Sequence, residues 1–287
     1  MLDTERGEPY TCDMNRLPLA KRAAILGMLV EGNSLRATSR LADVSINTVT
    51  KLLVELGAAC AEYHYKTVIN VRVRRLQCDE IWSFVGAKQK HVSPERRAEG
   101  WGDTWTWVAL DADTKLCVSY LVGGRGAWWA HEFMKDCAAR VKGKIQITTD
   151  GHRVYMDAVE DAFGMDVDYA QLQKIYGASD EPDTRYSPAV CIGCDMKVVS
   201  GNPDPKHVST SFVERQNLTM RMGMRRFTRL TNAFSKKVEN HAAMVAIHFM
   251  HYNFARIHKT LRVTPAMATG LADHVWSLEE IALLAEV

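Results

Sequence analysis

The chain has 287 residues, 47% hydrophobic and 24% charged, with a formal net charge of +2, which is typical of a globular protein with one large core and one small module. This composition excludes low-complexity sequence, and no stretch approaches the ~18 apolar residues of a membrane-spanning helix, so a membrane is not an expected partner. The polar residues 1–10 do not resemble a signal peptide, and seven scattered cysteines favour reduced thiols, so we expect a cytoplasmic protein.

The N-terminal part of the sequence is predicted to be an all-α domain. After a flexible tail at 1–14, the apolar residues of 15–65 recur at helical spacing. Asn33 or Ser34 can cap a second helix, and Ser45 can cap a third. A short helix, a tight turn and a capped helix are typical of a helix-turn-helix. The predicted helices cover residues 17–32, 35–41 and 45–64.

Polar and basic side chains lie on the exposed faces of the second and third predicted helices. Those of the third helix could reach bases or phosphates in a major groove, and the arginines of the second could hold the backbone. The alternative is a small helical bundle used for dimerisation. The predicted DNA contacts of this domain are Arg36, Arg40, Asn47, Thr48, Thr50 and Lys51.

Residues 66–258 are predicted to form an α/β domain. Three meandering strands followed by alternating helices and strands indicate a mixed sheet flanked by helices. Residues 177–206, rich in Gly, Pro, Ser and Asp, are predicted to be a loop or insertion, and 259–287 a C-terminal helical tail. The predicted elements are strands at 75–85, 104–112, 115–122, 144–149 and 167–176, and helices at 128–141, 152–163, 208–227 and 235–258.

Three carboxylates occupy positions that are typical of metal-binding or catalytic acids. Asp79 lies within an apolar strand, where an unpaired charge is costly, and Asp150 ends a buried strand, a position that aims an acid into a crevice. Glu214 lies in a basic helix. Carboxylates suit Mg²⁺, with Mn²⁺ as the alternative, and two such ions about 3.5–4 Å apart serve phosphodiester chemistry. Glu80, on the opposite strand face from Asp79, is an alternative ligand.

The segment around Glu214 is strongly basic, with seven basic residues against this one acid between positions 207 and 237. Such a band indicates a polyanionic partner, although solvated surface helices are the alternative. At about 100° per residue, Glu214 shares a helix face with Leu218 and with three of the predicted contacts, Asn217, Arg221 and Arg225. An acid in line with arginines suits a phosphate backbone that crosses the site. The predicted DNA contacts of this segment are Arg215, Asn217, Arg221 and Arg225.

Cys191 and Cys194 have the spacing of half a zinc site. No second pair with this spacing exists, and His207 is the one candidate for a further ligand nearby. The sequence therefore favours the absence of structural zinc without deciding the point.

Three segments together resemble transposases of the bacterial "insertion sequence one" family. Residues 79–88, Asp-Glu-Ile-Trp-Ser-Phe-Val-Gly-Ala-Lys, are similar to its first-aspartate motif, and Thr149-Asp150-Gly151 with Tyr155 is similar to its second. Residues 213–218, then Arg221 and residues 234–239, resemble the glutamate helix and its sequel. The three motifs occur in the right order over residues 76–250. The segment 252–265 also resembles the C-terminal signature of integrase-like cores, through Tyr252, Asn253, Arg256, His258, Leu261, Thr264 and Pro265.

The resemblance implies an RNase H-like catalytic core in which Asp79, Asp150 and Glu214 bind metal ions. It implies a nucleoid-associated bacterial enzyme that binds the terminal inverted repeats of an element, frees 3′-hydroxyls and joins them to target DNA. Cutting two ends of double-stranded DNA together requires at least a dimer. The chain departs from the family in lacking cysteines for an N-terminal zinc finger and in its long 177–206 segment. An RNase H-like nuclease that cuts without joining and a DNA-binding regulator with an inactive core remain the alternatives.

Overall fold

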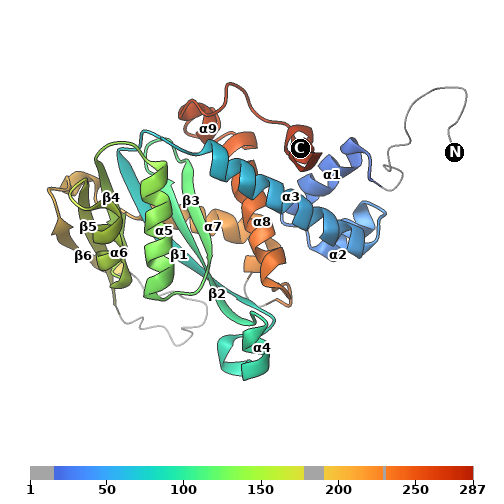
Figure 1. Cartoon of the computed structure of the whole chain (residues 1–287), viewed down its shortest axis with the longest axis horizontal. Coiled ribbons are helices and arrows are strands. Elements are labelled where there is room, and N and C mark those ends of the chain that lie inside the picture. Colours follow the sequence, from blue (N-terminus) through green and yellow to red (C-terminus); the bar gives the residue numbers. More distant parts are fainter. Residues whose placement is uncertain (1–15, 178–190, 229–230, 287) are drawn as a thin grey trace, which may run out of the picture.

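The computed structural model describes residues 16–177, 191–228 and 231–286. A six-stranded sheet lies on the left of Figure 1, and the N-terminal helices lie on the right. The strands of the sheet are β1 (Arg75–Val85), β2 (Gly102–Asp111), β3 (Cys117–Gly123), β4 (Ile145–Thr149), β5 (Val167–Tyr176) and β6 (Cys191–Ser200). Their order is β3-β2-β1-β4-β5-β6. β1, β2 and β3 form an antiparallel meander, β4 and β5 run parallel to β1, and β6 is antiparallel to β5.

The connections between the strands account for this order. The β2–β3 hairpin turns at Asp111, whose carboxylate accepts hydrogen bonds from the backbone N–H groups of Asp113 and Thr114, as expected of turn-forming acids. The parallel strands are joined through α5 (Ala127–Arg140) and α6 (Val154–Phe163), because parallel neighbours need a crossover. A three-stranded meander followed by parallel strands with crossover helices is an RNase H-like core, which confirms the predicted fold of this part.

Alternation along β1 assigns its side chains to the two faces of the sheet. Gln77 faces α7 (Ser211–Gly223), and its Oε1 accepts hydrogen bonds from the N–H groups of Phe212 and Val213, which satisfies donors in the first helical turn. On the other face, α5 and α6 pack side by side over the sheet (Figure 1). There the buried Trp107 of β2 packs against Tyr155 of α6. Trp107 is paired with Glu80 of β1, so Glu80 faces α5 and α6, whereas Gln77 faces α7.

The three predicted N-terminal helices are present as α1 (Leu19–Val30), α2 (Leu35–Leu41) and α3 (Ile46–Thr67). Ser34 and Ser45 cap α2 and α3, each accepting a backbone N–H hydrogen bond of 3.1 Å. The axes of α2 and α3 bend by 113°, within the range of about 90–120° for helix-turn-helix pairs. DNA binding by this pair stays a prediction.

A close helix crossing joins the N-terminal helices to the C-terminal part of the chain. α3 packs across α8 (Val238–Met250), as Figure 1 shows. Gly57 permits the contact, because a Cβ at this position would lie 2.4 Å from the Cβ of Ala243. The predicted domain limits at 65 and 258 stay predictions.

The part after α8 ends on short helices. A π-helical turn (His251–Ala255) replaces the predicted continuation to 258, and Asn253 there hydrogen-bonds both backbone groups of Cys117 on β3. The remaining short helices are α4 (Pro94–Ala98), α9 (Pro265–Ala268) and α10 (Leu278–Leu283). Within the described residues no single helix is long and apolar enough to cross a membrane, and only the bent α2–α3 pair meets those two criteria together.

Two predicted elements are wrong. Within the 177–206 segment, which was predicted as a loop or insertion, residues 191–200 form β6, because the free edge of β5 supplies a hydrogen-bonding ladder that the local composition does not reveal. Residues 178–190 of that segment, like the whole 1–14 tail, lie outside the described residues. The helix predicted at 208–227 ends at Gly223, and residues 225–227 form a separate 3-10 turn.

Candidate functional site

A cavity of about 560 Å³ opens where β1, β4, β5 and α7 meet. It brings together the three acids that were predicted from positions far apart in the sequence. Basic side chains also face it, so the cavity is acidic at its base and carries positive charge on its walls. Its lining residues are Asp79, Arg125, Asp150, Gly151, His152, Leu172, Gln173, Lys174, Thr210 and Glu214.

Asp79 is held by two hydrogen bonds. Its Oδ1 accepts from the backbone N–H of Glu80 at 2.9 Å, and its Oδ2 accepts from the Nδ2 of Asn217 at 2.8 Å. Burial and the charge of Asp150 raise the pKa of Asp79 to about 7. Asn217 is only 7% exposed, and its hydrogen bond orients Asp79; contact between Asn217 and DNA stays a prediction.

Glu80 is the most buried acid of the cluster, with its side chain 1% exposed. Its Oε1 has no hydrogen-bond partner, and the nearest nitrogen atoms of basic side chains, Arg125 Nε and His152 Nε2, each lie 3.8 Å away. Burial and the charges of Asp150 and Asp79 raise its pKa to about 8. A buried carboxylate with few hydrogen-bond donors and no close ion pair raises the folding free energy when it is ionised.

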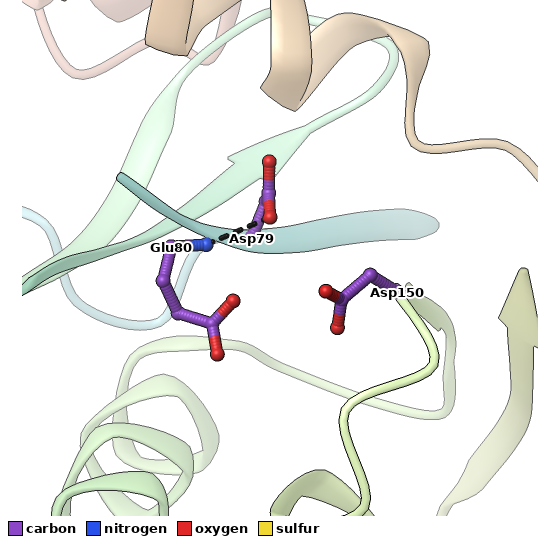
Figure 2. Close-up of side chains that lie close together, drawn as sticks. All are labelled: Asp79, Glu80 and Asp150. Carbon is purple, nitrogen blue, oxygen red and sulfur yellow. Dashed lines mark hydrogen bonds between the residues drawn. The ribbon is translucent and has the colours of Figure 1, made fainter. Parts of the chain in front are cut away.

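Asp150 lies close to both of these acids in the structure. Figure 2 shows the side chains of Asp79 and Glu80 leaving opposite sides of β1, with the carboxylate of Asp150 facing that of Glu80. Asp150 follows β4 directly, and its Oδ1 accepts a 3.0 Å hydrogen bond from the N–H of His152, which fixes the turn into α6. One carboxylate oxygen from each of the three acids lies within 4.8 Å of the others.

This cluster has the donor set of a divalent-cation site. Among the described residues, Asp79, Glu80 and Asp150 are the one group of metal-ligating side chains close enough to share an ion. Oxygen donors suit Mg²⁺ and Mn²⁺, and the unpartnered oxygen of Glu80 fits the presence of a cation. Because two of the acids have raised pKa values, a cation that bound here would compete with protons for their oxygens.

Glu214 lines the same cavity but is held away from the cluster. Its Oε1 accepts a 2.6 Å hydrogen bond from the hydroxyl of Thr210, and its Oε2 forms an ion pair with Lys174 of β5. Lys174 is a site residue that sequence reasoning missed, because pairing between β5 and α7 is not visible in the local sequence. Glu214 can join the other acids only if its pair with Lys174 opens.

Arg125 and His152 were also missed by sequence reasoning. Arg125 lies in the Gly-Gly-Arg-Gly loop between β3 and α5, and its guanidinium sits 4.3 Å above the ring of Trp105. His152 follows the Asp150-Gly151 turn, which was the available signal for it. Both side chains supply positive or proton-donating groups beside the acids, where a phosphate would need them.

The structure separates the other predicted DNA contacts into two groups. Arg36, Arg40, Asn47 and Lys51 are exposed on α2 and α3, and Arg215 is exposed on α7. Thr48, Thr50 and Arg221 are half-buried, with the Thr50 hydroxyl donating to the carbonyl of Ile46 at 2.8 Å. Arg225 lies beyond the end of α7, so the predicted helix face shared with Glu214 is wrong for this residue.

The possible zinc ligands do not form a cluster. Cys191 and Cys194 are exposed on β6, and the Cys191 thiol donates a hydrogen bond to the carbonyl of Gly193. His207 instead contacts Arg75 and Asp204. No third ligand lies with the two cysteines in the part of the chain that the structure describes.

Comparisons with known proteins give remote structural similarity. No protein-family model matches the chain, and no curated protein matches it in sequence. The structure is similar to the piggyBac transposase in a synaptic complex with hairpin DNA, with a TM-score of 0.38, 12% identity, and coverage of 93% of this chain and 69% of that one. It is also similar to a pre-cleavage Mos1 transpososome, with a TM-score of 0.24, 13% identity, and coverage of 87% and 80%.

Proposed function

We propose that the chain is a DNA transposase that cuts and joins phosphodiester bonds with divalent metal ions. One observation carries this proposal: Asp79, Asp150 and Glu214, from two strands and a helix of an RNase H-like core, line a single cavity. In this proposal these three acids hold Mg²⁺ or Mn²⁺, two ions per site. Glu80 is the alternative third ligand, because it lies nearer to both aspartates than Glu214 does.

The bound cations supply Lewis-acid activation of the attacking and leaving oxygens. The chain's own residues position the substrate: Arg125 and Lys174 attract the scissile phosphate into the cavity, and Asn217 orients Asp79. A water oxygen attacks phosphorus, and the bond to the 3′ oxygen breaks to leave a 3′-hydroxyl and a 5′-phosphate. That 3′-hydroxyl then attacks a target phosphodiester, and the target strand leaves through its own 3′ oxygen.

End recognition is the second part of the proposal. The capped α2–α3 pair presents exposed polar and basic side chains, which supports binding to terminal inverted repeats in a major groove. Two ends must be cut together, so the active species is at least a dimer on double-stranded DNA. The sequence motifs support a bacterial, nucleoid-associated member of the "insertion sequence one" type.

A strand-transfer assay on paired ends tests the proposal. The substrate carries the DNA that flanks the coding region on its two sides, and the full chain is supplied with Mg²⁺ or Mn²⁺. We expect cleavage that exposes 3′-hydroxyls, followed by joined products with target DNA. Cleavage without joining would identify a nuclease, and absence of metal-dependent cleavage would identify a DNA-binding regulator; either result overturns the proposal.

A further inference from the structure

A second cavity, a groove of about 820 Å³, lies between the N-terminal helices and the segment that follows α7. One wall comes from the end of α1, from α2 and from the start of α3, and the other from residues 225–226, residues 231–237 and α8. No Asp or Glu is among its lining residues, and none of those residues lines the acidic cavity. The groove's cationic residues are Arg36, Arg225, Arg226, Lys236 and Lys237.

The five cations lack acidic partners within the structure. Over residues 16–177, 191–228 and 231–286, no carboxylate forms an ion pair with any of them at the 4.0 Å limit. Like charges that line one groove repel each other, and the repulsion grows where solvent is partly excluded. An anion in the groove would remove this repulsion, and an extended polyanion would meet all five charges.

Arg226 is fixed in the groove wall by a buried polar chain. Its Nη1 donates to the Ser235 hydroxyl at 3.0 Å, and that hydroxyl lies 2.9 Å from the Nδ1 of the fully buried His241. The His241 Nε2 lies 3.2 Å from the Ser83 hydroxyl, which donates to the carbonyl of Thr104. Burial lowers the pKa of His241 to about 3, so the ring is neutral and can accept from Ser235 and donate to Ser83.

Burial also lowers the pKa of Arg226 to about 10, which leaves the guanidinium charged at neutral pH. Its position is set before any ligand arrives, because each member of the chain from Arg226 to Thr104 has a hydrogen-bond partner. A charged group that is partly desolvated and has no acidic partner gains most from an incoming anion.

The groove wall that carries Lys236 and Lys237 is hydrogen-bonded to the end of β1. The backbone N–H of Gly86 donates to the carbonyl of Ser235 at 2.7 Å, and Val85 pairs with Ser235 in a parallel bridge. Lys236 and Lys237 follow directly in the sequence. The end of β1, the strand that carries Asp79, thus positions the groove relative to the rest of the core.

We propose that this groove binds the phosphodiester backbone of duplex DNA, held between the N-terminal helices and the core. Ile46 and Thr50 at the start of α3 also line the groove, so a duplex that α3 reads passes beside Lys236 and Lys237. The groove contacts phosphates and the α3 side chains contact bases. DNA as the partner rests on the proposed function, but the groove requires no catalysis.

Salt-dependent binding by the full chain tests the groove. The probe is a fluorescein-labelled 30-base-pair duplex of arbitrary sequence, titrated by anisotropy at several salt concentrations between 50 and 200 mM. For Lys236→Ala/Lys237→Ala we expect a salt slope shallower by about 1.8, because each phosphate contact contributes about 0.9. The same relation gives an affinity loss on the order of tenfold per lysine at about 0.1 M salt.

The matched control is Lys135→Ala/Lys142→Ala, which removes the same charge from exposed positions on and after α5. We expect this control to retain most of the affinity and the salt slope. Asn240→Asp is a second variant, because it places an acid in the groove wall without changing side-chain size, and Asn70→Asp on the exposed surface is its control. Circular dichroism and thermal unfolding verify that each variant is folded.

Equal affinities and slopes for folded groove and control variants would overturn the proposal. A loss seen with single-stranded DNA or duplex RNA but not with duplex DNA would overturn it as well. The outcome is separable from the proposed function, because binding is measured without metal or turnover. If the wild-type chain never cleaves DNA but the groove variants bind the duplex more weakly, the groove proposal stands and the proposed transposase function is wrong. If the chain cleaves and joins DNA but the groove variants bind the duplex normally, the proposed function stands and the groove proposal is wrong.

Discussion

The acidic cavity and the basic groove are both attached to β1, and their charges are opposite. Carboxylates gather in and next to the cavity; Asp79 and Glu80 have raised pKa values, and Glu80 also has an unpartnered buried oxygen. The groove collects five cations and no acid among its lining residues. Each region holds like charges close together at a cost in folding free energy, and a bound ion of opposite sign would lower that cost.

The difference between the two regions indicates a division of labour. A small, partly buried oxygen cluster suits a compact divalent cation, whereas a wide groove with separated cations suits a polyanion. In the proposed function, catalysis takes place in the acidic cavity and the basic groove positions the substrate. Removing a charge from the cavity should therefore abolish turnover and spare binding, and removing one from the groove should do the reverse.

Asp150→Asn is expected to give the largest effect. The variant removes a negative ligand while keeping the hydrogen bond to the His152 N–H, so DNA cleavage should fall by about three orders of magnitude or more. Duplex affinity in the anisotropy assay should stay within about threefold of wild type, which corresponds to less than roughly 0.7 kcal/mol. Wild-type cleavage rates in this variant would remove Asp150 from the site.

Glu214→Gln compared with Glu80→Gln identifies the third ligand. We expect Glu214→Gln to reduce cleavage by about 100-fold or more, because Glu214 lines the acidic cavity and is the proposed third metal ligand. We expect Glu80→Gln to reduce cleavage less. Metal titration by calorimetry supplies a second readout. A larger loss of cleavage with Glu80→Gln than with Glu214→Gln would show that Asp79, Glu80 and Asp150 form the complete metal site. Glu214 would then only form the ion pair with Lys174.

The pH dependence of stability in the absence of metal should be altered by Glu80→Gln. A carboxyl whose pKa is raised on folding binds more protons in the folded than in the unfolded state, so stability falls as pH rises between its unfolded and folded pKa values. For Glu80 this window runs from its usual value of 4.5 to about 8. Urea unfolding at pH 5 and pH 8 should show the variant losing less stability over this range, by on the order of 1–3 kcal/mol. Parallel pH profiles for variant and wild type would contradict the assignment of this buried charge.

Arg225→Ala compared with Arg215→Ala is expected to give the smallest effect. Arg225 lines the groove, whereas Arg215 is exposed on α7 outside the groove lining. Arg225→Ala should weaken duplex binding on the order of tenfold at about 0.1 M salt, as loss of one phosphate contact does, and Arg215→Ala should weaken it less. Greater loss with Arg215→Ala would place the DNA path along α7 and away from the groove.

Local periodicity was sufficient to predict most of the elements and the acids of the cavity. The β1 strand shows as an apolar run, and Ser34 and Ser45 mark the starts of α2 and α3 because capping is a local interaction. The positions of Asp79 and Asp150 follow from the strands that carry them, since side-chain alternation and strand ends are local properties.

Features that depend on long-range pairing were not predicted. β6 has exposed side chains on both faces, so no apolar alternation marks it, and only its ladder with β5 defines it. Glu80 was assigned to the opposite face of β1 from Asp79, yet its carboxylate approaches that of Asp150 at the end of the neighbouring strand. The groove joins segments around residues 36, 50 and 236, and no local pattern relates them.

Crystals of the full chain grown with Mn²⁺ and a DNA duplex provide the most direct test of the metal site. An anomalous difference map at the manganese absorption edge locates the ions independently of any activity. We predict manganese peaks in the acidic cavity, within ligand distance of Asp79 and Asp150, with Glu214 released from Lys174. Manganese bound elsewhere, with the three carboxylates sharing no ion, would contradict the account.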